Sequence, residues 1–205
     1  NDHAKVFVID GRTLLLTGMN IADEYRLHWH DYMVELRGAQ FVDQLLAGAP
    51  PASDASVRLV LNTEDRKDIR PTLTVLLQQA REHVVMEQCY LSDPAIVRLL
   101  IALSHRHVRV TVVLPRRTDV HHHANMTAVG RLLAEADRSY LTVLLFPRMS
   151  HAKVTIVDHR NVFIGSANAF RASLDEMGEV NVLVRGRHRM VWRLRHRSAL
   201  PSPRA

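Results

Sequence analysis

Two stretches of this chain, residues 3–20 and 151–168, follow one pattern, and this internal repeat limits the possible folds more than any other feature. The first reads HAKVFVIDGRTLLLTGMN and the second reads HAKVTIVDHRNVFIGSAN. Counted from each leading histidine, a lysine follows at +2, an aspartate at +7, an asparagine at +17 and an acid at +28. Chance would reproduce the lysine, aspartate and asparagine about once in ten thousand, at ~5% for each specified residue type. The matched residues are His3 and His151, Lys5 and Lys153, Asp10 and Asp158, Asn20 and Asn168, and Asp31 and Glu179.

The spacing of the repeat suits the chemistry of a phosphate group. Side chains alternate along a strand, so the histidine and the lysine two positions later point to one face and can meet the same phosphate. The small residues at Gly18 and over Gly165-Ser166-Ala167-Asn168 let backbone and amide donors approach phosphate oxygens. The acid at +28, on the next strand, can accept a hydrogen bond from the outer imidazole nitrogen and leave the other nitrogen to react.

Each of these features, taken singly, also has a structural explanation. A lone histidine on a strand is usually structural, a lone lysine is usually solvated, and glycine or asparagine after a strand usually marks a turn. Their combination, present twice, favours a functional site instead. Asp10 and Asp158 belong to the motif and are grouped with the candidate catalytic residues, although their place at a hairpin turn suits a turn cap or ion pair better.

The amino-terminal part reads as strands with one short helix. Alternating and apolar runs predict strands over 3–9 and 12–17, joined by a turn at Asp10-Gly11. A further strand is expected over 31–37, followed by a short helix over 39–47.

After a linker rich in small residues and proline, GAPPASDAS at 48–56, strands and helices alternate. This alternation predicts an α/β domain with a mixed sheet. The run at 108–115 is nearly all apolar, as expected for a strand buried on both faces. The expected strands are 57–61, 84–91, 108–115, 141–146, 151–158, 161–165 and 179–185, and the expected helices are 71–83, 94–105 with Asp93 as its N-cap, and 124–136.

Charge and cysteine content restrict the possible partners and sites. An excess of 27 Lys+Arg over 21 Asp+Glu favours partners that carry phosphate, without choosing between nucleic acid and anionic lipid. A single cysteine, Cys89, excludes an internal disulfide and a zinc site with several cysteines, and its apolar surroundings predict a buried thiol. No apolar run reaches the ~20 residues of a membrane span, and no signal peptide is visible.

The duplicated HxKxxxxD pattern, each copy followed by (G/S)xN, resembles the phospholipase D superfamily from residue 3 to about residue 185. Three segments are most similar to its bacterial cardiolipin synthase branch: TGMNIADEY (17–25), WHDYMVELRG (29–38) and YLSDPAIVRLLIALSHRHVRVTVVLP (90–115). Two details depart from that branch. Phe170 and Ala172 stand where the branch has an aspartate and an arginine, with Ser173 kept, and Thr17-Gly18 replaces a glycine pair.

The resemblance implies an α/β fold of mixed sheets flanked by helices, in two pseudo-twofold related halves with one active site between them. It divides this chain into part of a first half (1–50), a second half (57–187) and a basic tail (188–205). Because the two halves should be of similar size and the chain opens at Asn1, the first half is expected to lack its leading strands and helices.

The resemblance also implies a phosphatidyltransferase that acts through a phosphohistidine, with no cofactor and no metal. His3 is then the nucleophile and His151 the general acid and base, although the residues alone do not distinguish them. The expected phosphate-binding and supporting residues are Lys5, Lys153, Gly18, Asn20, Ser166 and Asn168, with Asp31 and Glu179 behind the histidines. The implied partners are an anionic phospholipid substrate and a membrane surface, and the implied location is the bacterial cytoplasmic membrane, with peripheral attachment or an anchor in a preceding segment.

Two alternatives stay open at this point. A hydrolase of the same superfamily, acting on phospholipid or nucleic acid, would differ only in the acceptor and the groove. A non-catalytic protein that binds phosphate would keep the motifs without turnover.

The tandem His121-His122-His123 lacks a carboxylate or cysteine at ligand spacing, so a solvated or phosphate-facing loop is favoured over a metal site. Oligomeric state is not indicated by the sequence.

Overall fold

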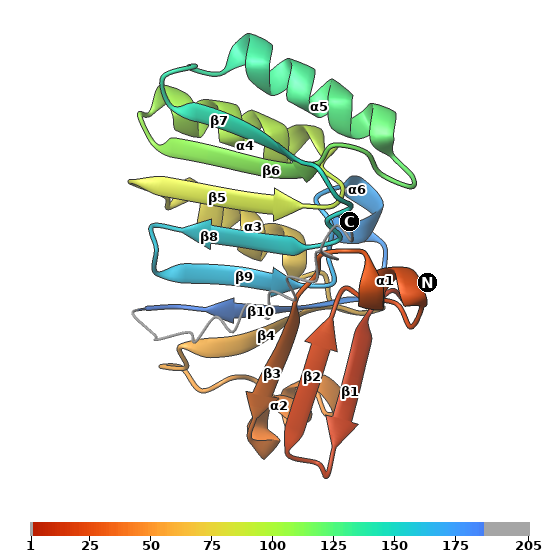
Figure 1. Cartoon of the computed structure of the whole chain (residues 1–205). Coiled ribbons are helices and arrows are strands. Elements are labelled where there is room, and N and C mark those ends of the chain that lie inside the picture. The colour runs from red at the N-terminus through yellow and green to blue at the C-terminus, as the bar shows by residue number, and fades with distance from the viewer. Residues whose placement is uncertain (1, 187–205) are drawn as a thin grey trace, which may run out of the picture.

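The computed structural model describes residues 2–186 as two β-sheets with six helices (Figure 1). The smaller sheet has the strand order β1-β2-β3 and is antiparallel throughout. The larger sheet has the order β4-β10-β9-β8-β5-β6-β7, with parallel pairs only at β5-β6-β7. The expected mixed sheet is therefore confirmed. The strands are β1 (Lys5–Ile9), β2 (Thr13–Thr17), β3 (Met33–Arg37), β4 (Val57–Asn62), β5 (His83–Gln88), β6 (Arg109–Pro115), β7 (Leu141–Phe146), β8 (Lys153–Val157), β9 (Asn161–Gly165) and β10 (Glu179–Val184).

The helices are α1 (Asp23–Leu27), α2 (Ala39–Leu46), α3 (Ile69–Gln78), α4 (Pro94–His105), α5 (His122–Glu135) and α6 (Arg171–Asp175). Asp93 caps α4 as expected, because its carboxylate accepts hydrogen bonds from the N–H groups of Ala95 and Ile96. None of the helices between residues 2 and 186 is long and apolar enough to cross a bilayer.

Two hydrophobic cores lie on opposite faces of the larger sheet. Helices α3, α4 and α5 cover one face, where Leu77, Leu100 and Leu132 are fully buried. The smaller sheet and α2 cover the other face, but only over β4, β10, β9 and β8, where Leu16 and Val182 belong to one buried cluster. Each such side chain, fully buried, contributes about 2 kcal/mol to the free energy of unfolding. The second core fixes the smaller sheet against the strand that carries the second motif.

The internal repeat is a repeat of structure as well as of sequence. In both copies two strands are joined by a turn whose first two residues have positive φ, Asp10 and Gly11 in one and Asp158 and His159 in the other. Helices α1 and α6, which the sequence analysis did not predict, both begin 20 residues after the motif histidine (23 − 3 and 171 − 151). The smaller sheet is therefore a copy of β8, β9 and β10.

Two predictions from the sequence are wrong in detail. The helix expected over 71–83 ends at Gln78, because the N–H groups of residues 81–83 donate to the carboxylate of Asp158 instead of continuing the helix. Strand β6 is not buried on both faces: Thr111 and Val113 are half-buried, since the smaller sheet does not extend over β5, β6 and β7. The division into domains stays a prediction, with its basic tail (188–205) outside the described residues.

The outer strands of the smaller sheet predict self-association. Strands β1 and β3 each pair only with β2 in the part of the chain that the structure describes, and Phe7 and Ile9 are 44% and 45% exposed. Such an edge invites pairing with another chain. We expect the protein to form oligomers in size-exclusion chromatography with light scattering, and the double substitution Phe7→Lys and Ile9→Lys to lower its mass. Val75→Lys, on a helix at 42% exposure, is the control. A monomeric parent protein would contradict this prediction.

Candidate active site

The two motif histidines lie at the same edge of the molecule, each just before a motif strand. His3 precedes β1 and His151 precedes β8, and the charge of His3 is one of the causes that lower the pKa of His151. The ends of β5, β6 and β7 and the short helices α1 and α6 lie at this edge too (Figure 1). The fold thus collects residues far apart in the sequence around two imidazoles.

The main chain at each histidine is bonded to the other repeat. The N–H of His3 donates to the carbonyl of Gly178 at 2.8 Å, and the N–H of His151 donates to the carbonyl of His30 at 2.7 Å. Gly178 and His30 each precede the acid at +28 of their own repeat. Each histidine is therefore held, through its own backbone, next to the acid of the opposite repeat.

The side chain of each histidine is also paired with the acid of the opposite repeat. His3 Nδ1 lies 3.1 Å from Glu179 Oε1, and His151 Nδ1 lies 2.9 Å from Asp31 Oδ2. The sequence prediction that each imidazole is paired with the acid on the next strand of its own copy is wrong. In both pairs the carboxylate fixes Nδ1 and leaves Nε2 as the nitrogen that can face a reacting group.

The carboxylate of Glu179 is buried and receives several donors. Ser166 Oγ donates to Oε2 at 2.5 Å and Ser173 Oγ donates to Oε1 at 2.5 Å, besides the contact with His3. Ser166 sits this close because Gly165 lets β9 approach β10: a Cβ there would lie 2.3 Å from the carbonyl oxygen of Val180. The predicted supporting residue Ser166 thus contacts the acid, and Ser173 was missed as a site residue although its retention was noted.

The two lysines lie beside their histidines, as the period-two alternation predicts. Lys153 Nζ is 2.8 Å from His151 Nδ1 and 3.1 Å from Nε2, and it also donates to the carbonyl of His151. Lys153 is 1% exposed, and burial lowers its pKa to about 8. Lys5 Nζ donates to the carbonyl of His3 at 2.7 Å, and burial lowers its pKa as well. Two cationic groups therefore lie at one site with reduced hydration.

The remaining predicted residues divide into two groups. Gly18 belongs to the site, because a Cβ there would lie 3.0 Å from Asp31 Oδ2 and 3.1 Å from Lys153 Nζ. Asn168 is 2% exposed and its Oδ1 is buried without a hydrogen-bond partner among the described residues. Asn20 is exposed and donates to the hydroxyl of Tyr25.

The motif aspartates do not reach the site. Asp158 accepts hydrogen bonds from the N–H groups of residues 81–83 at the far end of β8. Asp10 occupies the equivalent turn after β1 and is exposed. Their grouping with the candidate catalytic residues is not supported by their location, while the role of turn residue is. Backbone hydrogen bonds lower the pKa of Asp158 against the effect of its burial, which keeps it charged in this role.

Aromatic rings surround His151 on one side. The rings of Tyr25, Trp29 and Tyr90 have centroids 5.0, 5.8 and 6.3 Å from that of the imidazole. The Tyr90 hydroxyl donates to Asp119 at 2.6 Å, which fixes the loop before α5 at the site. Burial lowers the pKa of His151, and the hydrogen bond with Asp31 opposes this effect. Sequence reasoning missed Tyr25, Tyr90 and Asp119, because no spacing links them to the motifs.

Glu87 is the centre of a polar cluster, with Ser150, Tyr32 and His30, that joins the two repeats next to the second motif. Glu87 accepts hydrogen bonds from Ser150 at 2.7 Å and from the hydroxyl of Tyr32 at 3.1 Å, and His30 Nε2 lies 3.5 Å from it. Cys89, just beyond, is buried as expected, and burial raises the pKa of its thiol to about 12. The cluster therefore supports the segment that holds His151.

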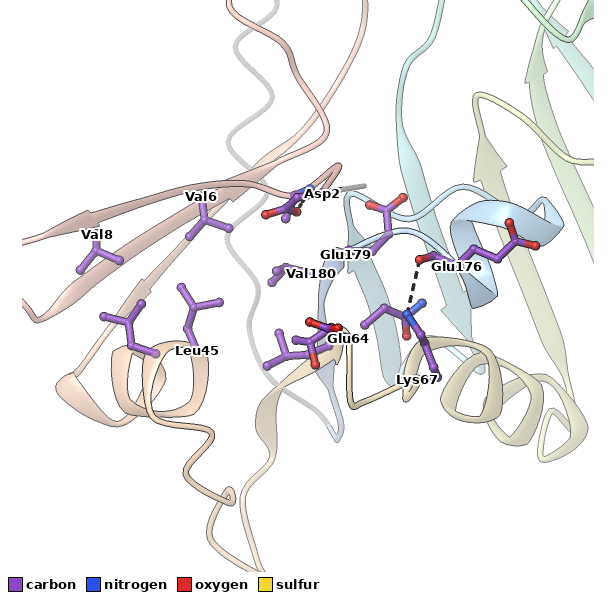
Figure 2. Close-up of a pocket in the computed structure, with 15 residues that line it drawn as sticks. Asp2, Val6, Val8, Leu45, Glu64, Lys67, Glu176, Glu179 and Val180 are labelled. Atoms are coloured by element: carbon purple, nitrogen blue, oxygen red, sulfur yellow. Dashed lines mark hydrogen bonds between the residues drawn. The ribbon is translucent and has the colours of Figure 1, made fainter.

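A cleft of about 970 Å³ runs along β1 and not over the histidines (Figure 2). Its walls are apolar at one end, with Val6, Val8 and Leu45, and charged at the other, with Glu64 and Lys67. It borders the histidine site at Asp2, Gly178 and Glu179, which lie in its wall. The cleft is adjacent to the site but is not the site.

Comparison with known proteins gives consistent matches. The profile of the family described as "Cardiolipin synthase, PLD-like domain" matches residues 73–195. Cardiolipin synthase B of Escherichia coli is 28% identical over 91% of this chain and 52% of its own length, and the minor cardiolipin synthase of Bacillus subtilis is 26% identical over 88% and 51%. The chain thus spans about half the length of these relatives.

Among solved structures, the phosphatidylserine synthase of Haemophilus influenzae aligns with a TM-score of 0.75 at 14% identity, over 90% of this chain and 58% of that one. A phospholipase D family member of Salmonella typhimurium aligns with a TM-score of 0.53 at 23% identity, over 63% and 82%. These likenesses confirm the expected fold of mixed sheets flanked by helices.

Replacing the buried Lys153 should stabilise the protein. Its folded-state pKa of about 8 lies below the ordinary lysine value of 10.5, because burial disfavours the charged ammonium. We expect Lys153→Met to raise the free energy of unfolding at pH 7 by roughly 1–3 kcal/mol. Between about pH 8 and 10.5 the unfolded parent binds more protons, so its stability rises with pH, and the variant should lack this rise.

The measurement is urea unfolding at pH 7 and pH 10, with the exposed Lys67→Met as the matched control. Destabilisation by Lys153→Met at pH 7 would show that the ammonium contributes net stability through Asp31 and Glu179.

Proposed function

The chain belongs to the family of cardiolipin synthase, phospholipase D-like domains, and from this premise we propose that it is a phosphatidyltransferase that works through a phosphohistidine. The observation that carries the proposal is the crosswise pairing of two histidines with two acids around two buried or half-buried lysines. A double displacement at phosphorus needs these parts: a neutral imidazole, a protonated imidazole and cationic groups for the phosphate oxygens.

In the proposed first step, Nε2 of His3 attacks the phosphorus of a phosphodiester. The bond from phosphorus to the leaving alkoxide breaks, and His151 gives that oxygen its proton. In the second step His151 takes the proton of an incoming alcohol, whose oxygen attacks the phosphorus and releases His3. Glu179 and Asp31 hold the Nδ1 protons, so that each imidazole reacts through Nε2.

The groups that would hold the phosphate are those with spare donor capacity. Lys153 and Lys5 supply ammonium groups in a site of low hydration, where their attraction for an anion is strengthened. Asn168 supplies an amide beside Ser173, whose hydroxyl accepts from the Asn168 N–H at 2.8 Å. Their proposed role is to stabilise the charge on the equatorial oxygens in the transition state.

The assignment of His3 as nucleophile rests on the family resemblance. It agrees with the greater exposure of the His3 side chain, 26% against 5% for His151, because the nucleophile must reach phosphorus directly. Burial lowers the pKa of His151 and favours its neutral form. An anionic phosphodiester beside His151 raises that pKa again, which would restore the protonated form that a general acid needs.

We propose an anionic phospholipid as the substrate and a membrane surface as the place of action. Support comes from the curated relatives, which are named as cardiolipin synthases, and from the formal charge of +6. A bacterial cytoplasmic membrane, with peripheral attachment or an anchor outside the described residues, is the proposed location.

Removal of either histidine should abolish turnover, because each performs a separate step. We expect His3→Ala and His151→Ala each to lower the turnover of a phospholipid by about 10³-fold or more, with the double variant little worse than either. Rapid quenching and peptide mass spectrometry should find the phosphorylated histidine at residue 3. His28→Ala, at an exposed histidine, is the control. Phosphorylation at residue 151 would reverse the two roles.

The products distinguish the transferase from its alternatives, because water or an alcohol can resolve the covalent intermediate. With phosphatidylglycerol vesicles, we expect cardiolipin and free glycerol in excess over phosphatidic acid, measured by mass spectrometry, and matched DNA substrates left uncut. Phosphatidic acid alone would indicate a hydrolytic phospholipase, and cut DNA a nuclease. Inertness toward every substrate, with phosphate binding retained, would indicate a non-catalytic protein and overturn the proposal.

A further inference from the structure

Three aliphatic side chains protrude into solvent from two loops beside His151. Ile21 is 93% exposed, Leu27 is 56% exposed and Val120 is 51% exposed. Ile21 and Leu27 lie on either side of the acidic first turn of α1, and Val120 lies in the loop between β6 and α5. Exposed aliphatic residues that gather beside a functional site mark an interaction surface.

Ring contacts place α1 and the loop between β6 and α5 beside the same histidine, His151. Tyr25, in α1, and Trp29, two residues after the end of α1, pack on His151. From the other loop, His121 packs on Tyr90 at 5.1 Å, and Tyr90 packs on His151. In Figure 1, α1 and the loop between β6 and α5 lie on the same side of the molecule. Ile21, Leu27 and Val120 therefore stand around the approach to the site.

Arginines accompany these aliphatic residues. Arg116 and Arg117 follow β6 directly, and Arg148 lies just before the second motif; all three are exposed. The N–H of Arg116 donates to the carbonyl of Phe146 at 2.8 Å, which joins the ends of β6 and β7 and brings the arginines to one place.

The acids on the same side are Asp23, Glu24 and Asp119, and the Tyr90 hydroxyl bonds Asp119. Three arginines balance these three carboxylates, and the exposed His121, His122 and His123 add side chains that can donate hydrogen bonds to phosphate oxygens. A mixture of protruding aliphatic residues and arginines fits the interface of an anionic bilayer, where apolar side chains enter below the head groups and cations stay at their level.

We propose that Ile21, Leu27 and Val120, with Arg116, Arg117 and Arg148, form a membrane-docking rim that seats the protein on a bilayer containing anionic phospholipid. The inference rests on the proposed function, because a lipid phosphodiester lies at head-group depth and the site that acts on it must face the bilayer. A protein partner is less well suited to three aliphatic side chains that lie in two separate segments, around α1 and in the loop between β6 and α5, rather than in one continuous patch. The rim would hold the histidines at the depth of the head groups.

Binding to vesicles, measured without turnover, tests the rim directly. The parent chain should sediment with phosphatidylglycerol–phosphatidylcholine vesicles and bind phosphatidylcholine vesicles more weakly. Ile21→Ser with Leu27→Ser should weaken binding by about tenfold or more, because two aliphatic insertions are lost. The matched control is Leu46→Ser with Val75→Ser, which removes aliphatic side chains of 71% and 42% exposure on α2 and α3.

A fluorescence measurement locates the bilayer relative to the site. The chain has two tryptophans, so Trp192→Phe leaves Trp29 as the single reporter beside His151. Vesicles brominated near the top of the acyl chains should quench Trp29 more than vesicles brominated near the chain ends. Quenching by neither would place the rim away from the membrane and overturn the inference.

A water-soluble phosphodiester separates this inference from the proposed function. The rim variant should keep its turnover of that substrate within about twofold while losing vesicle binding, because the rim touches only the bilayer. A chain that binds vesicles through the rim but turns over no substrate would contradict the proposed function and still support the membrane-docking rim. Equal vesicle binding by the rim and control variants would overturn the rim, and a change in oligomeric state alone would assign it to self-association.

Discussion

The exchange of acids between the two repeats is the interaction on which the rest of the structure depends. Glu179 bonds His3 and Asp31 bonds His151, and both pairs are fixed by backbone bonds from the same histidines to Gly178 and His30. These contacts require the starts of β1 and β8 to meet, and therefore require the smaller sheet to lie on the face of the larger one. The second hydrophobic core stabilises this packing, so the core and the site depend on one geometry.

The buried charged groups of the site lower the stability of the fold. A buried lysine with a pKa of about 8, a buried glutamate and an imidazole whose pKa is lowered by burial all lie in one small volume. Buried charges of this kind are tolerated only when each has partners, which the two serines supply for Glu179. The same low hydration strengthens the attraction between Lys153 and any anion that enters. The burial that strengthens the attraction for an anion at the site also lowers the stability of the fold.

Much of this could be predicted from the sequence, because repetition and periodicity are local signals. The duplicated motif, the mixed sheet, the cap at Asp93 and the bounds of nine of the ten strands to within two residues are confirmed, while the strand expected over 84–91 ends at Gln88. The five-residue helices α1 and α6 were missed, since neither has a side-chain cap or enough turns to show a period. The crosswise pairing was predicted wrongly, because a spacing of 28 residues says how far an acid lies along the chain and not which histidine it meets. The aromatic rings at His151 come from segments that carry no motif.

The pairing itself can be measured by long-range proton–nitrogen NMR of the imidazole rings, with conservative substitution of each acid. Glu179→Gln should shift the nitrogen signals of His3, and Asp31→Asn should shift those of His151, because each acid holds the Nδ1 proton of the opposite repeat's histidine. The parent protein should show a proton on Nδ1 of both imidazoles. The opposite correspondence, with Glu179→Gln acting on His151 and Asp31→Asn acting on His3, would contradict the account of a site built by exchange between the repeats.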